Sequence, residues 1–203
     1  MKNRSVDLYN PITWISIGFG AGLSPIAPGT LGSLFAAIIY FFLINPFILN
    51  FLDIVYFVFF LFGSYILGIY AYNLTAEGDP DPDYFVWDEF IGMWISCLPM
   101  IFIDQDFIYL ILAFLIFRLF DILKPWPIII FDRKESALGV MLDDIVAGLM
   151  TIPFSVLIYL FIFPGKLKFQ LLSRLNFKII DFNNYKKNKN LIFKKNFFKI
   201  KKN

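Results

Sequence analysis

Residues 143–163, DDIVAGLMTIPFSVLIYLFIF, place two aspartates directly before an uncharged apolar run that can cross a membrane as a helix. Such a crossing takes about 20 apolar residues. The composition agrees with this segment, because 59% of the 203 residues are hydrophobic and the mean hydropathy is +0.69. Soluble domains are about half apolar. The sequence therefore predicts an integral membrane protein.

Five apolar segments are expected to be helices, at 31–49, 54–72, 90–103, 107–120 and 145–163. By length, the first, second and last can span the membrane. The third and fourth are short and predict a helical hairpin that enters partway or packs inside the bundle. Pro46 and Pro153 are expected to kink or break their helices. The predicted fold class is all-α: a polytopic membrane helical bundle with kinked or short helices and polar active-site loops on one face.

Charge divides the chain into two parts. Residues 1–165 carry 15 acidic and 6 basic side chains, whereas 166–203 carry 12 basic residues and the single acid Asp181. We expect a membrane-embedded domain at 1–165 and a basic, flexible C-terminal tail at 166–203. A basic tail next to a hydrophobic segment favours contact with anionic lipid headgroups over contact with nucleic acid. No nucleic-acid partner is expected, and the oligomeric state stays open.

Several chemistries are excluded by the residue types present. Cys97 lies in an uncharged stretch, so nothing nearby lowers its pKa as a cysteine phosphatase requires. The chain has no histidine, which removes phosphohistidine chemistry, histidine metal sites and Ser-His-Asp triads. Any reaction must use Asp, Glu, Lys, Arg, Ser or Thr.

The polar residues between the segments form three clusters, at 24–33, 77–89 and 118–144. If consecutive segments run antiparallel, all three clusters meet on one membrane face, as in an active site. A crossing by 145–163 then puts the basic tail on the opposite face, against the positive-inside tendency if the site is cytoplasmic. Either Pro153 makes the last segment re-entrant, or the glycine-rich stretch before Leu23 adds a crossing.

The first cluster contains Pro28-Gly29-Thr30 directly before a helical run. Its glycines fit neither a dinucleotide fingerprint nor a P-loop. Thr30 can cap this helix, and the free amides of the first turn can face an anion. An ordinary capped helix with glycines at packing contacts explains the pattern equally well.

Two acidic pairs are expected to open apolar helices. Gly92 follows Asp88-Glu89 by one turn, and Gly148 follows Asp143-Asp144 by one turn. A small residue after each pair leaves room for a divalent ion and a headgroup between the helices. The helix dipole also favours acids at a helix start, so each pair taken alone has a purely electrostatic explanation.

A third group of charges lies in FRLFDILKPWP, 117–127. Arg118, Asp121 and Lys124 are three residues apart and share one helix face until Pro125 ends the helix. They form either a salt-bridged helix end or two cations held by one carboxylate and aimed at a phosphate.

Four blocks in order resemble the signature blocks of the phosphatidylglycerophosphatase A family: GLSPIAPGTLGSL (22–34), DPDYFVWDEFIGMW (81–94), FRLFDILKPWPI (117–128) and GVMLDDIVAG (139–148). The resemblance implies a phosphatase that hydrolyses phosphatidylglycerophosphate to phosphatidylglycerol and phosphate with Mg²⁺. It implies a phospholipid substrate and a place in phospholipid biosynthesis at the bacterial cytoplasmic membrane, with the site expected on the cytoplasmic face. Two departures from the family pattern are Ser136-Ala137, where glycines are usual, and the lysine-rich tail.

The candidate site follows from the charges and these blocks together. A hard cation held by oxygen ligands neutralises a phosphate monoester and orients the attacking nucleophile. We expect the two acidic pairs to bind the metal or to supply a general base. Asp121 is expected to orient the two cations or to bind the metal, and Asp81 is expected to bind the metal. The catalytic candidates are Asp88, Glu89, Asp121, Asp143 and Asp144. The metal candidates are Asp88, Glu89, Asp143, Asp144 and Asp81. The phosphate-binding candidates are Gly29, Thr30, Ser33, Arg118 and Lys124.

Three other functions are compatible with parts of this pattern. A CDP-alcohol phosphotransferase is also a Mg²⁺-dependent, carboxylate-rich membrane enzyme, but its Asp-Gly and Ala-Arg signature is absent. A transporter places charges near the middle of long spans, whereas the acids here lie at segment ends. A non-enzymatic membrane scaffold leaves the acidic pairs without a purpose.

Overall fold

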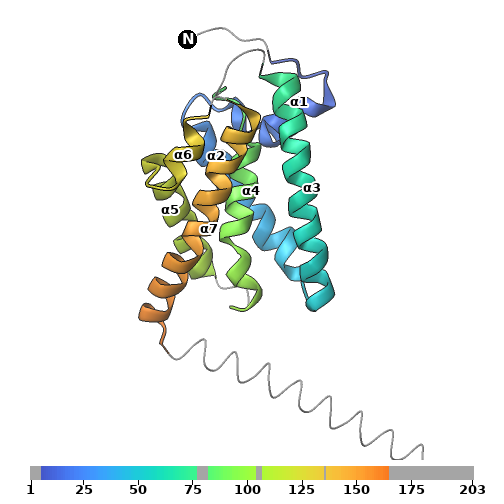
Figure 1. Cartoon of the computed structure of the whole chain (residues 1–203). Helices are drawn as coiled ribbons and strands as arrows, with labels where there is room; N and C mark the ends of the chain where they lie inside the picture. The colour runs from blue at the N-terminus through green and yellow to red at the C-terminus, as the bar shows by residue number, and fades with distance from the viewer. Residues whose placement is uncertain (1–5, 77–81, 104–106, 135, 165–203) are drawn as a thin grey trace, which may run out of the picture. The chain divides into compact units, whose positions relative to one another are not determined.

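The computed structural model describes residues 6–76, 82–103, 107–134 and 136–164, and every regular element in these ranges is helical (Figure 1). The predicted all-α fold is therefore confirmed. The chain divides into two units, Met1–Phe161 and Ile162–Asn203. The helices described here belong to the first unit, apart from the last residue of α7.

The helices follow one another in the order of the predicted segments, with short additions. They are α1 (Pro11–Ser16), the 3-10 helix η1 (Gly18–Leu23), α2 (Pro28–Ile39), α3 (Phe51–Thr75), α4 (Trp87–Ser96), α5 (Phe107–Leu123), α6 (Ile128–Asp132) and α7 (Ala137–Ile162). A π turn at Tyr40–Ile44 and 3-10 turns at Asn45–Phe47 and Leu98–Ile101 extend α2 and α4.

Three helical stretches are long and apolar enough to cross a membrane within the described ranges: Pro28–Phe47, Phe51–Thr75 and Ala137–Ile162. They correspond to the first, second and last predicted segments, which confirms the assignment of the spans. At 10 and 17 residues, α4 and α5 are as short as expected.

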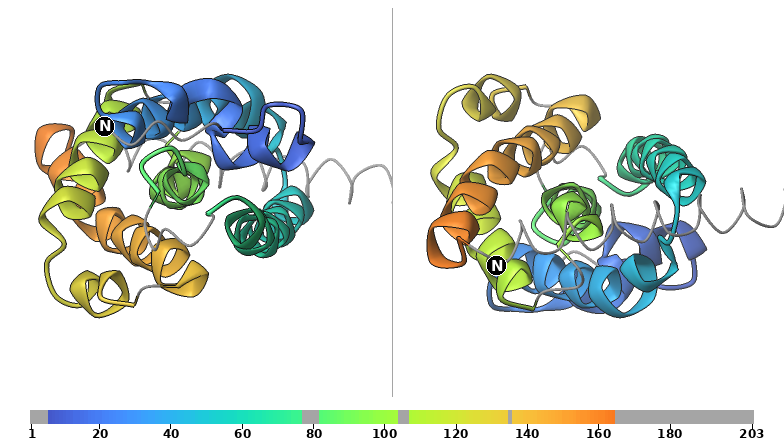
Figure 2. Two further views of the ribbon diagram at one scale, coloured as in Figure 1. Left: turned by 90° about the horizontal axis from the view of Figure 1, so that it is seen from above. Right: turned by 90° about the horizontal axis from the view of Figure 1, so that it is seen from below.

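The short helix α4 lies at the centre, with α2, α3, α5 and α7 around it (Figure 2). Every residue of α4 except Glu89 is buried. Two tryptophans attach it to its neighbours, because Trp94 Nε1 donates to the Ala36 carbonyl of α2 at 3.0 Å and Trp87 Nε1 donates to the Ser64 carbonyl of α3 at 3.0 Å. The prediction that this segment packs inside the bundle is confirmed.

Glycines allow α4 and α7 to approach each other closely. A Cβ built on Gly148 would lie 2.4 Å from the carbonyl oxygen of Gly92, and a Cβ on Gly92 would lie 2.7 Å from the carbonyl oxygen of Asp144. A side chain at either position would collide with backbone, which cannot rotate away. The contact puts the two acidic pairs at the same level of the bundle.

The two prolines behave differently. The helix containing Pro46 loosens into the π and 3-10 turns and ends at Phe47, so this helix breaks as predicted. At Pro153 the helix does not break, since α7 continues through it to Ile162. This continuity removes the reason for a re-entrant last segment. The other alternative fails as well, because α1 and η1 have six residues each and are too short to cross.

Candidate active site

The three polar clusters meet at a cavity of about 560 Å³ at one end of the bundle. Its walls come from the start of α2, the approach to α4 and its first turn, the end of α5, the α6 region and the start of α7. The predicted convergence of the clusters is thus confirmed. The predicted residues that line the cavity are Gly29, Thr30, Asp88, Glu89, Arg118, Asp121, Lys124, Asp143 and Asp144.

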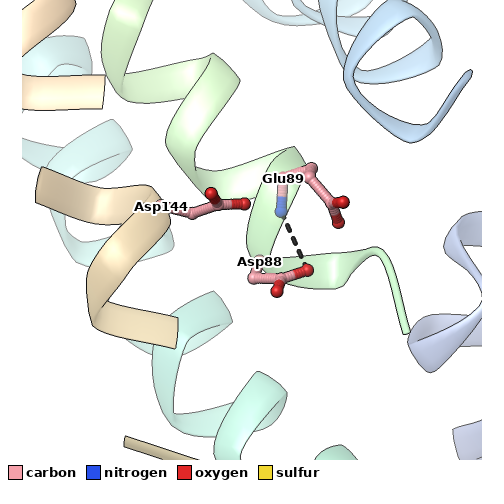
Figure 3. A group of neighbouring side chains, drawn as sticks. All are labelled: Asp88, Glu89 and Asp144. Atoms are coloured by element: carbon pink, nitrogen blue, oxygen red, sulfur yellow. Dashed lines mark hydrogen bonds between the residues drawn. The ribbon is translucent and has the colours of Figure 1, made fainter. Parts of the chain in front are cut away.

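Three carboxylates from two helices converge on one point of this cavity. Asp144 reaches from α7 toward the first turn of α4, which carries Asp88 and Glu89 (Figure 3). One oxygen from each lies within 4.8 Å of the others. Among the described residues, Glu89 Oε2 and Asp144 Oδ2 are buried and have no hydrogen-bond partner. Clustered oxygen donors with unsatisfied buried atoms fit a hard divalent cation.

Without such a cation, these acids resist ionisation. Burial and the neighbouring Glu89 carboxylate hold the pKa of Asp88 well above its ordinary value. Burial raises the pKa of Glu89 to about 7, although the Arg118 guanidinium opposes the shift. A bound divalent cation favours the charged form of each carboxylate and reverses this preference.

Arg118 connects α5 to the acidic cluster and to α2. Its NH1 lies 2.5 Å from Asp121 and 4.0 Å from Glu89. NH1 also donates to the Ser33 hydroxyl at 3.2 Å, and this hydroxyl in turn donates to the Gly29 carbonyl at 2.7 Å. Ser33 is therefore a buried support of Arg118 rather than part of the cavity wall. Arg118 Nε has no partner among the described residues.

The sequence predicted that Asp121 holds both Arg118 and Lys124, but in the structure Lys124 has other partners. Its Nζ lies 2.7 Å from Asp143 and also pairs with Asp132. The backbone explains the difference, because Lys124 has a φ of +43° just after the last residue of α5, so its side chain leaves the face of Arg118 and Asp121. Although partial burial lowers it, the two carboxylates raise the pKa of Lys124 above its ordinary value. The lysine stays charged.

Gly29 permits a close approach between α2 and the acidic cluster. A Cβ at this position would lie 2.1 Å from Glu89 Oε1. The role predicted for Thr30 as a helix cap is wrong, since α2 begins two residues earlier at Pro28, a residue favoured at the first helical position. Ala27 precedes it with a φ of +48° and lines the cavity, as Lys124 does. Strained backbone of this kind often accompanies functional sites.

The second acidic pair does not open its helix, contrary to the prediction. α7 starts at Ala137, so Asp143 and Asp144 are its seventh and eighth residues. The Ser136 hydroxyl accepts from the Gly139 amide at 3.2 Å and caps the start of α7. The favourable interaction of acids with the helix dipole at a helix start therefore does not explain Asp143 and Asp144.

The comparison with known families decides the identity of this arrangement. The profile described as phosphatidylglycerophosphatase A matches residues 14–159, which include every described wall of the cavity. The chain belongs to the phosphatidylglycerophosphatase A family. It is accordingly a phosphatase, which removes the CDP-alcohol phosphotransferase and the scaffold as explanations.

Individual relatives of the phosphatidylglycerophosphatase A family agree. The chain is 42% identical to phosphatidylglycerophosphatase A of Escherichia coli (strain K12), over 74% of this chain and 84% of the relative. It is 37% identical to the Haemophilus influenzae enzyme of the same name, over 73% and 89%. A putative phosphatidylinositol-3-phosphatase of Bacteroides thetaiotaomicron is 40% identical over 66% and 84%. No solved structure matches the chain.

The cavity of this family member also contains residues that sequence reasoning missed. Asp132 and Lys134 line it, on and just after the short helix α6. Their charge was visible in the sequence, but only the packing of α6 brings Asp132 to Lys124. Asp81, a predicted metal ligand, lies outside the described residues.

Proposed function

We propose that the chain is a Mg²⁺-dependent phosphatase that hydrolyses phosphatidylglycerophosphate to phosphatidylglycerol and phosphate. The observation that supports this most strongly is the buried cluster of Asp88, Glu89 and Asp144 in one cavity with two basic side chains held by carboxylates, in a chain of this family. Two relatives bear the name of this activity.

Asp88, Glu89 and Asp144 would hold the cation, because their oxygens converge and two of those oxygens are unsatisfied. When bound, Mg²⁺ supplies charge neutralisation of the phosphate and activation of the attacking water. Asp121 and Asp143 face Arg118 and Lys124 instead, so we assign them to holding these cations in place.

Arg118 and Lys124, which both line the cavity, would bind the phosphate. Each is fixed by a carboxylate before substrate arrives, so little reorganisation is needed when charge develops on the phosphate oxygens. Gly29 and Thr30 line the cavity from the start of α2, where free amides of the first turn add donors for an anion.

The proposed setting is the bacterial cytoplasmic membrane, with the site at the cytoplasmic face and a phospholipid as substrate. Three spanning helices and bacterial relatives support a membrane location. We assign the reaction to residues 1–165 and no catalytic role to the basic tail at 166–203, because the described residues that line the cavity lie between Ala27 and Asp144 and already include the acids and cations that the reaction needs.

The substrate is tested by offering the purified protein, in detergent with Mg²⁺, three lipids in parallel. Phosphate should be released from phosphatidylglycerophosphate much faster than from phosphatidylinositol 3-phosphate, the lipid in the name of the third relative. A CDP-linked lipid should give no product. Preference for the inositol lipid would replace the proposed substrate while leaving the phosphatase chemistry in place.

A further inference from the structure

One wall of the cavity is both apolar and exposed, at Ile122. Ile122 lines the cavity, and its side chain is 67% exposed. Phe85, another large apolar residue of the described lining, is only 5% exposed. Ile122 therefore forms an exposed apolar edge of the cavity's opening at the end of α5.

An apolar stripe on α5 leads to this opening. Ile111, Leu115, Leu119 and Ile122 are spaced by four, four and three residues, so they share one face. Their exposed fractions are 44, 57, 52 and 67%. An exposed apolar face of this kind marks contact with a membrane or with another protein, and in a chain with three candidate spans we take it to face hydrocarbon.

Helix α2 runs beside this stripe in the opposite direction. At the end of the two helices nearest the site, Arg118 of α5 contacts Ser33 of α2. At their other end, the rings of Phe107 and Phe41 lie 5.8 Å apart. The outward side chains of α2 are apolar too, with Leu34 and Ile38 each 43% exposed. The seam between α2 and α5 is thus lined by apolar side chains from membrane depth to the cavity.

The other rim of the cavity is charged. Lys124, Asp132 and Lys134 line it near α6, and Asp132 and Lys134 are exposed. A phosphomonoester headgroup needs these charges, whereas transferring the acyl chains of the lipid into water is unfavourable. A lipid substrate satisfies both demands only by approaching from the apolar rim.

We propose that the phospholipid substrate enters sideways along the α2–α5 seam, with its acyl chains on the Ile111–Ile122 stripe and Ile122 at the threshold of the site. This inference rests on the proposed lipid phosphatase function. In this proposal, Ile122 positions the end of the substrate that carries the acyl chains. Phosphate leaves to water past the charged rim near α6.

The test compares Ile122→Trp with Ile66→Trp, a matched change on the lipid-facing side of α3, where Ile66 is 53% exposed and outside the cavity lining. Each is assayed on long-chain phosphatidylglycerophosphate and on a water-soluble short-chain analogue with the same headgroup. For Ile122→Trp, kcat/KM on the long-chain lipid should fall about tenfold more than on the analogue. The larger side chain displaces the acyl chains of the long-chain lipid, and its phosphate then loses alignment with the site. Ile66→Trp should change both substrates equally.

A second measurement uses the unmodified chain and so does not depend on how the variants fold. A phospholipid with a photoreactive acyl chain and the phosphomonoester headgroup should cross-link to α2 and α5, and excess unlabelled substrate should compete. Competed cross-links on α3 or α7 instead, or equal losses on both substrates for Ile122→Trp, would overturn the entry route. Failure of the unmodified chain to release phosphate from either substrate would instead reject the proposed function.

Discussion

At the scale of single residues, the carboxylates of the site differ in how closely each is paired with a basic side chain. Asp121 and Asp143 lie 2.5 and 2.7 Å from Arg118 and Lys124, whereas the oxygens of Asp88, Glu89 and Asp144 converge on one another and Glu89 lies 4.0 Å from Arg118. Like charges packed this closely and buried destabilise the folded chain unless a cation compensates them. We therefore expect the cluster to lower the stability of the metal-free chain and to bind a cation.

Asp144→Asn separates a ligand role from a structural one. The asparagine keeps the shape and removes the cost of burying an ionisable carboxyl group, so the metal-free variant should unfold at the same temperature as the unmodified chain or higher. Hydrolysis should fall by about 100-fold or more, since the ion contributes several kcal/mol to the transition state. Thermal unfolding in detergent and phosphate release measure the two effects, and Asp88→Asn should repeat them. Near-normal turnover in both variants would place the ion elsewhere.

Asp132→Asn tests the residue that supports Lys124 from α6. An ion pair this exposed contributes up to about 1 kcal/mol, so KM should rise by roughly fivefold or less with kcat little changed. Lys124→Gln should cost more, because it removes the cation that faces the phosphate. Arg133→Gln, next to Asp132 and outside the cavity lining, is the control. Equal kcat losses in Asp132→Asn and Lys124→Gln would assign Asp132 to the reaction itself.

At the scale of helices, the glycine contact between α4 and α7 sets the spacing of the acidic cluster. Asp88 and Asp144 each lie one turn before the glycine of their own helix, so any separation of the two glycines also separates the carboxylates. The long apolar runs predicted the three candidate spans well, because length and composition determine which segments can cross a membrane.

Helix starts and side-chain partners were less predictable, for identifiable reasons. α2 starts at Pro28 and α7 at Ala137 because a proline at the first position and a serine cap outweigh the positions of the nearest polar residues. The partner of Lys124 depends on its left-handed backbone and on where α6 packs, which no periodicity encodes.

Gly148→Ala should destabilise the bundle and impair the site together. The new methyl group would lie 2.4 Å from the Gly92 carbonyl oxygen, and overpacking against backbone costs about 1–3 kcal/mol. Gly63→Ala on α3 is the matched control, since no heavy atom outside its own helix lies within 4 Å of that position. Thermal unfolding should show a loss for Gly148→Ala alone, with reduced turnover below the transition. Equal stability of the two variants would show that the contact is loose.

At the scale of the whole molecule, the described unit places its site at one end of its spanning helices. α7 has 26 residues and an expected length of about 39 Å, more than the roughly 30 Å of the hydrocarbon core. The proposed cytoplasmic site and the positive-inside tendency of the basic tail therefore favour opposite orientations of the chain.

Single cysteines decide the orientation, because the native Cys97 is buried and contributes little background. Arg133→Cys lies near the site, whereas Leu49→Cys lies just past the turns that extend α2 and Phe161→Cys lies in the last turn of α7, where its side chain is exposed. A membrane-impermeant maleimide added outside intact cells should label the last two and spare the first. Labelling of Arg133→Cys from outside would invert the proposed orientation, and labelling of Phe161→Cys on the same side as Arg133→Cys would show that α7 does not cross.

The most direct test of the central claim is phosphate release from phosphatidylglycerophosphate as a function of free Mg²⁺, starting from protein stripped by a chelator. If Asp88, Glu89 and Asp144 hold the ion that hydrolysis requires, release is absent from the stripped protein and returns along a saturable curve as Mg²⁺ is added. Hydrolysis that proceeds at the full rate in excess chelator would contradict the account.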